Sequence, residues 1–179
     1  EVGPGVKNVE PSDLVVLHWR KGKGIQSEPP KYRWNDKELN AGWITTFNSY
    51  AIVSENRCTR IPKDTDKEVA ALFGCAITTG FGVVENNEKM KIGESLVVFG
   101  AGGIGLSIIQ AASLVSSWPI IAVDLFQSRL DLASRLGATH IINSNKLNAK
   151  DEIMKILGDR ELDVFIDNTG LPSIIELGY

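Results

Sequence analysis

From about residue 67 onward, short apolar runs alternate with segments of helical character, and this alternation limits the possible folds more than any other feature. The apolar runs fall at residues 96–99, 120–124, 139–142 and 163–167, and the helical segments at 67–73, 78–87, 103–112, 127–136 and 149–157. Strands that are apolar throughout belong to a parallel sheet covered on both faces. Right-handed crossovers then predict a doubly wound α/β sheet with its four strands in the spatial order 3-2-1-4.

The first 66 residues have a different character, because they are turn-rich and contain no long helical pattern. Alternating apolar residues predict strands at 14–17 and 50–53. Residues 20–38 carry six basic and three acidic side chains and the pair Pro29-Pro30, which favours a long surface loop. A basic lobe that faces an anion or a substrate is the alternative. We therefore expect two domains, residues 1–66 and 67–179.

The segment at residues 100–105, Gly-Ala-Gly-Gly-Ile-Gly, follows the first apolar strand directly and opens a helix. It fits the pattern G-x-G-x-x-G, which is weak by itself but has the required setting here. Gly100 would permit a sharp turn, Gly102 would let backbone amides approach a pyrophosphate, and Gly105 would let the helix pack closely on the strand. The phosphates would lie at the positive end of the helix dipole. A purely structural tight turn is the alternative.

An acidic residue supports a dinucleotide site. Asp124 ends the second strand, nineteen positions after Gly105, where a carboxylate accepts hydrogen bonds from the adenosine ribose hydroxyls. It would also repel a 2′-phosphate, so NAD is favoured over NADP. Arg129 lies five residues further on and suits either cofactor. A simple helix-capping role for Asp124 is the alternative. Asp167 ends the fourth strand, and the loop after it should lie beside the cofactor.

Composition excludes several other classes of protein. The 179 residues carry a net charge of −3, which argues against a nucleic-acid binder. No run of apolar residues is long enough for a membrane helix, so no membrane partner is expected. Only two cysteines are present, which favours a reducing, cytoplasmic setting. The chain does not begin with Met, which suggests that it was cut from a longer protein.

These motifs together resemble a known family. Residues 72–82, Leu-Phe-Gly-Cys-Ala-Ile-Thr-Thr-Gly-Phe-Gly, followed by the glycine turn and Val123-Asp124, resemble the zinc-dependent alcohol dehydrogenases of the medium-chain dehydrogenase/reductase superfamily. Segments 1–6, 11–15 and 45–50 resemble the family's substrate-side domain, which is a GroES-like β-barrel. The resemblance implies an incomplete Rossmann domain preceded by part of that barrel.

The resemblance also implies roles for particular residues. Cys75 corresponds to the third protein ligand of the family's catalytic zinc, and a thiolate suits zinc. Without the motif around it, a single Cys is more often a small buried hydrophobe. Thr79 corresponds to a threonine near the nicotinamide and Ile104 to an apolar residue against the cofactor. The residues expected at the cofactor are Thr79, Gly100, Gly102, Gly103, Ile104, Gly105, Asp124, Arg129 and Thr169.

The chain departs from the family pattern in three places. The other ligands of the catalytic zinc and the proton-relay groups would lie upstream of residue 1. The four-cysteine lobe that holds a structural zinc would fall between Leu17 and Gly42, where this chain has no cysteine. The last two strands of a six-stranded sheet would lie beyond residue 179. A catalytic zinc is therefore expected only in the complete protein, a structural zinc is not expected, and the catalytic residues stay unassigned.

The remaining candidate residues favour structural roles. His18 and His140 each fall in an expected strand, and neither is expected to bind metal. Cys58 is expected to be a packed or surface residue. The four tryptophans, Trp19, Trp34, Trp43 and Trp118, are expected to anchor the core or loops and not to form a stacking platform.

The resulting hypothesis is an NAD-dependent, zinc-type alcohol or polyol dehydrogenase. The complete protein should act on a small-molecule alcohol and form a homo-oligomer, whereas the 179 residues alone should show weak or no turnover. One alternative is a zinc-free, NADPH-dependent enzyme of the quinone-reductase type. Another is a module that binds NAD without any chemistry.

Overall fold

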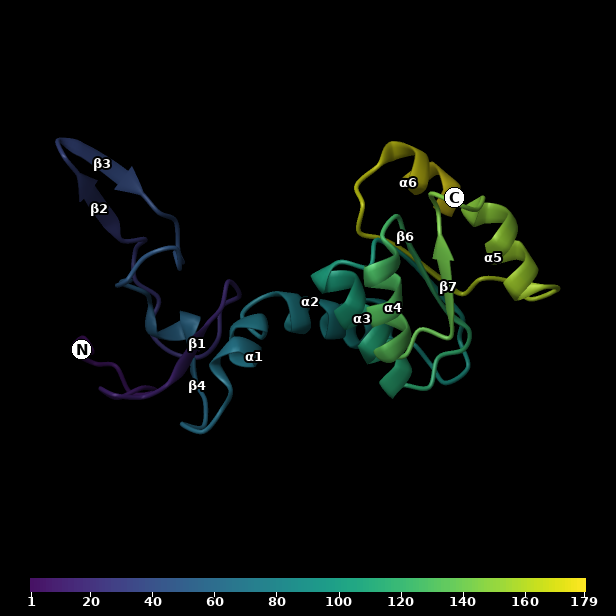
Figure 1. Ribbon diagram of the computed structural model, residues 1–179. Coiled ribbons are helices and arrows are strands. Elements are labelled where there is room, and N and C mark those ends of the chain that lie inside the picture. The colour runs from purple at the N-terminus through teal and green to yellow at the C-terminus, as the bar shows by residue number, and fades with distance from the viewer. The chain divides into compact units, whose positions relative to one another are not determined.

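The computed structural model describes residues 1–179, which form two compact units, residues 1–75 and 76–179 (Figure 1). The first unit contains β1 (Val15–Leu17), β2 (Lys31–Trp34), β3 (Lys37–Asn40), η1 (Glu55–Arg57), β4 (Cys58–Arg60) and α1 (Lys67–Leu72). The second contains α2 (Ala76–Gly82), η2 (Val83–Glu88), β5 (Leu96–Phe99), α3 (Gly103–Leu114), β6 (Ile120–Asp124), α4 (Gln127–Arg135), β7 (His140–Asn143), α5 (Ala149–Leu157), β8 (Val164–Asp167) and α6 (Pro172–Gly178). The expected domain boundary at residue 66 stays a prediction.

The second unit is built on a four-stranded parallel sheet with the order β7-β6-β5-β8. This order confirms the prediction from the sequence, because these are the third, second, first and fourth strands of the sheet in chain order. Leu96 at the start of β5 lies opposite Ile120 of β6 and Val164 of β8. Every residue of β5 and β6 is buried, as the uniformly apolar sequence of these two strands predicts.

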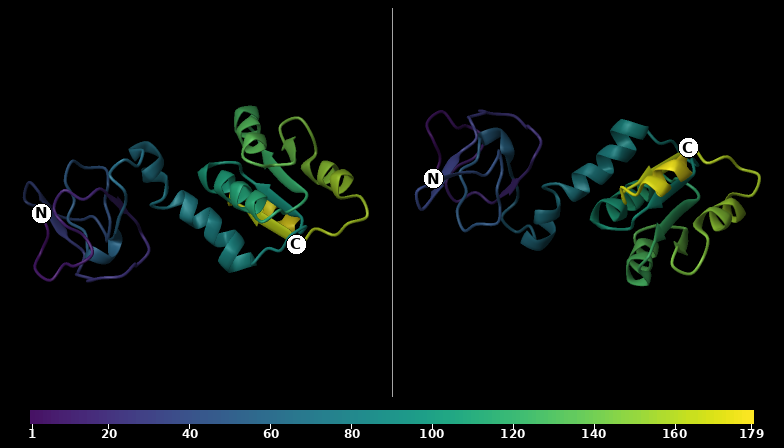
Figure 2. Two further views of the ribbon diagram at one scale, coloured as in Figure 1. Left: turned by 90° about the horizontal axis from the view of Figure 1, so that it is seen from below. Right: turned by 90° about the horizontal axis from the view of Figure 1, so that it is seen from above.

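Helices cover both faces of this sheet (Figures 1 and 2). On one face, α3 and α4 pack on alternate residues of the central strands, including Val98 and Ala122. On the other face, α5 and α6 pack on the intervening residues, including Val97 and Ile121. Alternate side chains of a strand point to opposite faces, so each central strand contributes to both cores. No helix of the chain has the length and apolar character needed to cross a lipid bilayer.

Local residue chemistry sets the ends of the helices. Gly137 follows α4 with φ +116°, a conformation that favours glycine, and ends the helix where the sequence predicts. Asn148 begins α5 by accepting the N–H of Asp151 on its side chain. α2 and α3 lie in close contact, because a Cβ atom on Gly80 would be 2.4 Å from the Cβ of Ser107.

The first unit differs from the prediction in two respects. β1 pairs with β4 in an antiparallel arrangement, with Val16 opposite Thr59, and residues 50–53 form no strand. Tyr50 and Ile52 are 91% and 68% exposed, so the apolar alternation there does not mark a buried face. The Ile52 N–H donates to the side-chain hydroxyl of Tyr32 in β2 and not to a backbone carbonyl of a paired strand.

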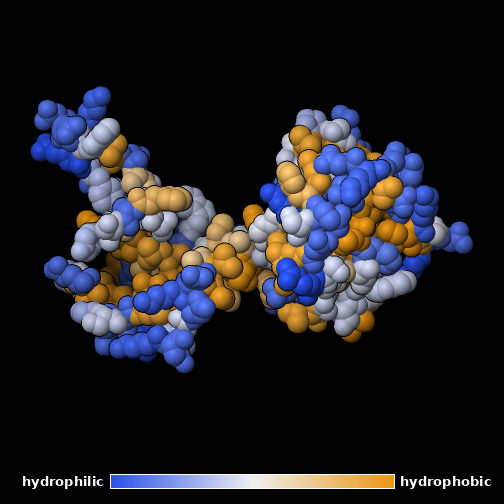
Figure 3. All heavy atoms as spheres, in the orientation of Figure 1, coloured by the Kyte–Doolittle hydropathy of each residue, from blue (hydrophilic) through white to orange (hydrophobic).

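The expected surface loop at residues 20–38 was also only partly right. β2 and β3 form an antiparallel hairpin, in which Tyr32 lies opposite Leu39. Asn35, with φ +54°, takes the left-handed conformation at the turn between them. Polar and charged side chains dominate this hairpin in sequence, and Figure 3 shows it as a hydrophilic projection. Tyr32, Trp34 and Leu39 share one side of the hairpin, but none of them is buried. The many charged residues of the segment therefore favoured a loop where a strand pair forms.

Candidate functional site

The site begins at the glycine turn between β5 and α3. Gly100 has φ +89°, so the chain turns sharply at the end of the strand in a conformation that favours glycine. Gly102 is the residue before the first turn of α3 and provides no side-chain cap. The first N–H groups of a helix have no partner within it, so those at this end of α3 are open to an anion.

Two glycines of the turn have different reasons to lack a side chain. A Cβ atom on Gly105 would lie 2.0 Å from the carbonyl oxygen of Gly100, which no packing can accommodate. A Cβ atom on Gly102 would meet nothing within 4 Å, although this residue lines the cavity described below. The absence of a side chain at Gly105 is therefore needed for the chain to fold into this turn. At Gly102 it leaves the space beside the end of the helix open.

Asp124 at the end of β6 faces this turn. Its Oδ2 accepts the N–H of Ala101 at 2.8 Å, and its Oδ1 accepts the N–H of Phe126 at 2.9 Å. The residue is 6% exposed, so these are hydrogen bonds to a buried carboxylate. Asp124 does not cap α4, because that helix begins after Phe126 without any side-chain cap. The carboxylate instead connects the end of β6 to the glycine turn.

Arg129 lies on the outer side of Asp124. Its Nη1 is 3.6 Å from Oδ2 of Asp124, and its guanidinium lies 4.8 Å from the ring centroid of Phe126. The ion pair and the contact with the aromatic ring both involve the positive charge of Arg129. This end of the cavity therefore carries one negative charge, on the carboxylate of Asp124, and one positive charge, on the guanidinium of Arg129.

These groups line one cavity of about 490 Å³, within the range of small-molecule sites. Eight of the nine residues predicted at the cofactor lie on it: Gly100, Gly102, Gly103, Ile104, Gly105, Asp124, Arg129 and Thr169. Thr79 does not line this cavity and is exposed on α2. The cavity lies at the carboxyl ends of β5, β6 and β8, where parallel sheets of this order bind ligands.

The loop after β8 closes one side of the cavity. Asp167 accepts hydrogen bonds from the hydroxyl and the N–H of Thr169 and from the N–H of Gly170. Burial by itself would raise the pKa of Asp167, but these three hydrogen bonds together lower it below its usual value. A charged Asp167 therefore holds the loop that brings Asn168 and Thr169 to the cavity.

Other lining residues were not predicted from the sequence. Their shared feature is that most of them stand at or just after the carboxyl end of a strand, and they include Phe99, Val123, Leu125, Phe126, Ser144, Leu171 and Ile174. Ser144 follows β7 directly, so it could have been predicted from the rule that ligands bind at the carboxyl ends of parallel strands. No local motif marks Leu171 or Ile174, because they reach the cavity from α6 and the residue before it.

A metal site does not form within these residues. Cys75 is exposed and lies at the end of the first unit. No group of three or more His, Cys, Asp or Glu side chains is placed to hold a metal ion. A catalytic zinc site requires about three protein ligands, so the residues present do not fit a complete one.

The other candidates have identifiable structural contacts. His18 lies between Thr59 and the carbonyl of Arg20, at 2.9 and 2.7 Å, and His140 contacts the hydroxyl of Thr139 at 2.9 Å. Cys58 is half-buried in β4, and burial raises the pKa of its thiol. Trp19, Trp34 and Trp118 are each more than half exposed and are not core residues, so of the two expected roles, core or loop anchor, only the loop role stays a prediction for them.

The sheet order, the uncapped helix and the acidic residue opposite it define an α/β protein of the Rossmann type. Comparison with known proteins refines this class. The family model described as "Zinc-binding dehydrogenase" matches residues 103–179. The S-(hydroxymethyl)glutathione dehydrogenase of Escherichia coli O139:H28 is 32% identical over 183 residues, which cover 87% of this chain and 50% of that protein.

Solved structures agree with these matches. Benzyl alcohol dehydrogenase from Acinetobacter calcoaceticus is 29% identical with a TM-score of 0.79, over 99% of this chain and 54% of that one. An alcohol dehydrogenase zinc-binding domain protein from Burkholderia ambifaria is 40% identical with a TM-score of 0.65, over 70% of this chain and 34% of that one. These comparisons confirm the resemblance of the chain to the zinc-dependent alcohol dehydrogenases. It spans about half the length of the curated relatives that it matches.

Proposed function

We propose that this chain is the NAD-binding part of an alcohol or polyol dehydrogenase. The observation that carries the proposal is the carboxylate of Asp124, which lies in one cavity with the uncapped first turn of α3. Anions are favoured at such a helix end, and carboxylates at the end of the second strand accept hydrogen bonds from ribose hydroxyls. Homologous alcohol dehydrogenases support an oxidoreductase of this type.

Each part of the cofactor has a matching group in the cavity. The N–H groups of the first turn of α3 would hold the pyrophosphate, and the open space at Gly102 would let it approach the backbone. Asp124 keeps acceptor capacity for the ribose hydroxyls, because each carboxylate oxygen can accept two hydrogen bonds. Thr169 would add a polar contact from the loop after β8. Bound NAD supplies the hydride acceptor for oxidation of the alcohol.

The charges at the ribose end favour NAD over NADP. The buried carboxylate of Asp124 would repel a 2′-phosphate, and its ion pair with Arg129 engages the one cation that lines the cavity. In the zinc-free, NADPH-dependent alternative, Arg129 would have to leave Asp124 and bind the phosphate. A module without catalytic chemistry would have the same cavity, so the cofactor alone does not distinguish it from the dehydrogenase.

The remaining parts of the proposal concern the longer protein. Cys75 would be one thiolate ligand of a zinc ion whose other ligands lie outside these residues, and Thr79 would lie near the nicotinamide. Residues 1–66 would be part of a GroES-like domain. The complete protein would act as a cytoplasmic homo-oligomer on a small alcohol, and these 179 residues alone would show weak or no turnover.

Calorimetric titration of the chain with NAD⁺ and with NADP⁺ tests the cofactor proposal. We expect NAD⁺ to bind about tenfold more tightly or better, because Asp124 disfavours the extra phosphate. The control variant Arg135→Gln, which removes an exposed cation from the end of α4, should retain NAD⁺ binding. Tighter binding of NADP⁺ that Arg129→Gln abolishes would favour the NADPH-dependent enzyme. Binding of neither nucleotide would refute the proposal.

A further inference from the structure

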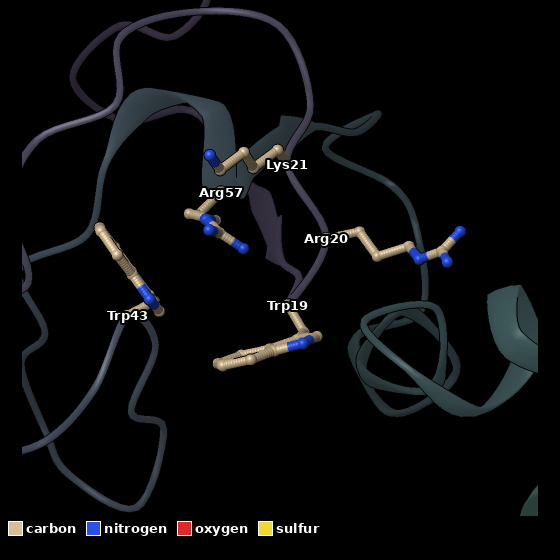
Figure 4. A pocket seen from close by; sticks show the side chains of 5 residues that line it. All are labelled: Trp19, Arg20, Lys21, Trp43 and Arg57. Atoms are coloured by element: carbon tan, nitrogen blue, oxygen red, sulfur yellow. The ribbon is translucent and has the colours of Figure 1, made fainter.

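We propose that the first unit contains a second ligand site, which binds a phosphate monoester carried on a flat ring. The site is a hollow of about 420 Å³ lined by Trp19, Arg20, Lys21, Trp43 and Arg57 (Figure 4). All five residues belong to residues 1–75, so the site is separate from the cofactor cavity in the second unit. It extends beyond the proposed function and does not depend on NAD binding.

Arg57 is the centre of the argument, because it is a buried charge without a counter-ion. The residue is 5% exposed, and it takes part in none of the ion pairs of the molecule. Its Nη2 donates to Oε1 of Gln26 at 3.2 Å, but its Nε is buried without a hydrogen-bond partner. Burying a charged group is costly unless it is paired and hydrogen-bonded. A bound anion in the hollow that Arg57 lines would supply the missing counter-charge.

Two tryptophans form the walls beside this guanidinium. The Cζ atom of Arg57 lies 5.8 Å from the ring centroid of Trp19 and 5.4 Å from that of Trp43. Figure 4 shows the guanidinium pointing between the two indole rings. Trp19 is 60% exposed, so its face is available to a ligand. Indole faces stack on flat groups, which indicates a ligand with a ring attached to its anionic group.

The backbone holds Arg57 in place from both sides. The N–H of His18 donates to the carbonyl oxygen of Arg57 at 3.0 Å, and the N–H of Gly22 donates to the carbonyl oxygen of Asn56 at 2.7 Å. The carboxylate of Glu55 accepts the N–H groups of Ile25, Lys7 and Asn8, and these hydrogen bonds hold its pKa below the usual value. The backbone around Arg57 is therefore fixed by hydrogen bonds. The carboxylate of Glu55 is occupied by backbone N–H groups and forms no ion pair with Arg57.

The charge of the hollow selects phosphate over carboxylate. Lys21 extends toward the Arg57 side of the hollow, whereas the side chain of Arg20 points away from it (Figure 4). No acidic residue is among the lining residues. Two cations match the dianion of a phosphate monoester, and a guanidinium binds its oxygens in a bidentate manner. A carboxylate would leave one of the two positive charges uncompensated.

Tryptophan fluorescence provides the test, with phenyl phosphate as the probe. The chain has four tryptophans, so a background with Trp34→Phe and Trp118→Phe leaves the emission of Trp19 and Trp43. We expect phenyl phosphate to change this emission saturably and to bind about tenfold more tightly than benzoate or inorganic phosphate. If benzoate binds as tightly as phenyl phosphate, the site does not prefer phosphate over carboxylate. If inorganic phosphate binds as tightly, the ligand does not need an attached ring.

Charge variants test whether the named residues form the site. Arg57→Gln should weaken phenyl phosphate binding about tenfold or more, and Lys21→Gln should weaken it several-fold. Arg33→Gln is the matched control and should leave the affinity unchanged, because it removes the same charge from an exposed residue of β2 that does not line the hollow. If Arg57→Gln does not fold, Lys21→Gln carries the test. Equal weakening by Arg33→Gln and Lys21→Gln would show non-specific attraction and refute the site.

The cofactor cavity must be separated from this signal, because it also attracts anions. Saturating NAD⁺ should leave the titration of Trp19 and Trp43 by phenyl phosphate unchanged. Complete competition by NAD⁺ would assign the phosphate to the glycine turn and overturn the second site. Failure of NAD⁺ to bind would refute the proposed function and leave the fluorescence result standing, so the two failures are distinguishable.

Discussion

Asp124 shows how one side chain connects the fold to the proposed chemistry. Its two oxygens accept the N–H groups of Ala101 and Phe126, so the carboxylate that would face the ribose also fixes the glycine turn. The spacing of nineteen residues between Gly105 and Asp124 predicted that Asp124 binds the ribose, but it did not predict these hydrogen bonds. They depend on the approach of two strand ends, which no spacing along the chain reveals.

Asp124→Asn is expected to destabilise the second unit by about 2 kcal/mol. An amide has one acceptor oxygen, so either the Ala101 or the Phe126 N–H would then face an NH₂ group. The shift in the denaturant midpoint measures the loss. The control Asp131→Asn changes an exposed side chain of α4 and should shift the midpoint little. An unchanged midpoint for Asp124→Asn would mean that the carboxylate does not hold the turn.

Two glycine substitutions are expected to separate folding from binding. Gly105→Ala should destabilise the chain by about 3 kcal/mol, because its Cβ atom would lie 2.0 Å from the Gly100 carbonyl oxygen. Gly102→Ala meets nothing within 4 Å and should fold normally, but it should weaken NAD⁺ binding about tenfold. Thermal unfolding and calorimetry of both variants give the two readouts. A Gly102→Ala variant that binds NAD⁺ normally would contradict the proposed approach of the pyrophosphate.

At the scale of elements, β5 and β8 are joined by a side-chain contact as well as by their parallel pairing. Ser95, just before β5, donates from its N–H and its hydroxyl to Oδ2 of Asp163, at 2.7 and 2.8 Å. These two hydrogen bonds lower the pKa of the Asp163 carboxyl below its usual value. Asp163 was predicted as the first residue of a strand, whereas in the structure it precedes β8 and ties it to β5.

This contact predicts a pH-dependent contribution to stability. Because the pKa of Asp163 is lowered in the folded state, its contribution is present above the unfolded pKa of about 3.9 and is lost as the pH falls through the folded value. Asp163→Asn should therefore lower the melting temperature at pH 7, and the difference from the parent chain should shrink below about pH 4. Asp159→Asn, at an exposed position, is the control. A difference that stays constant with pH would contradict this linkage.

Elements were predictable where their burial is regular, and unpredictable where it is not. β5, β6 and α5 follow the expected ranges closely because uniform or periodic burial produces a regular pattern of apolar residues. The hairpin of β2 and β3 has no buried side chain, and the alternation of Tyr32 and Trp34 with charged residues is too short and too polar to have been recognised as a strand. Residues 50–53 show the opposite error, because their apolar residues are exposed.

At the scale of the whole molecule, the buried apolar residues are distributed unevenly. Of the buried hydrophobic residues, only Val16 and Ala70 belong to the first unit. The rest belong to the second unit, mainly in the two clusters on either face of the sheet. Segments with few buried apolar contacts open at low free energy, so the two units should differ in local stability.

Hydrogen exchange is expected to reveal this difference. The amides of β5 and β6 should be the most protected in the chain, whereas those of β2 and β3 should exchange early. Mass spectrometry of peptides from a timed exchange series measures both. Saturating NAD⁺ should add protection to the glycine turn and the loop after β8, and none to the hairpin. Equal protection of the hairpin and the central strands would contradict the expected difference.

The position of β8 in the sheet has a consequence for handling the protein. β8 pairs with β5 along one side only, so its other side presents N–H and C=O groups without strand partners. Such an edge is a template for adding another chain, and the half-buried Phe165 and Ile166 next to it would favour the addition. On heating or concentration, the purified chain is therefore expected to aggregate edge to edge while most of its secondary structure is still intact.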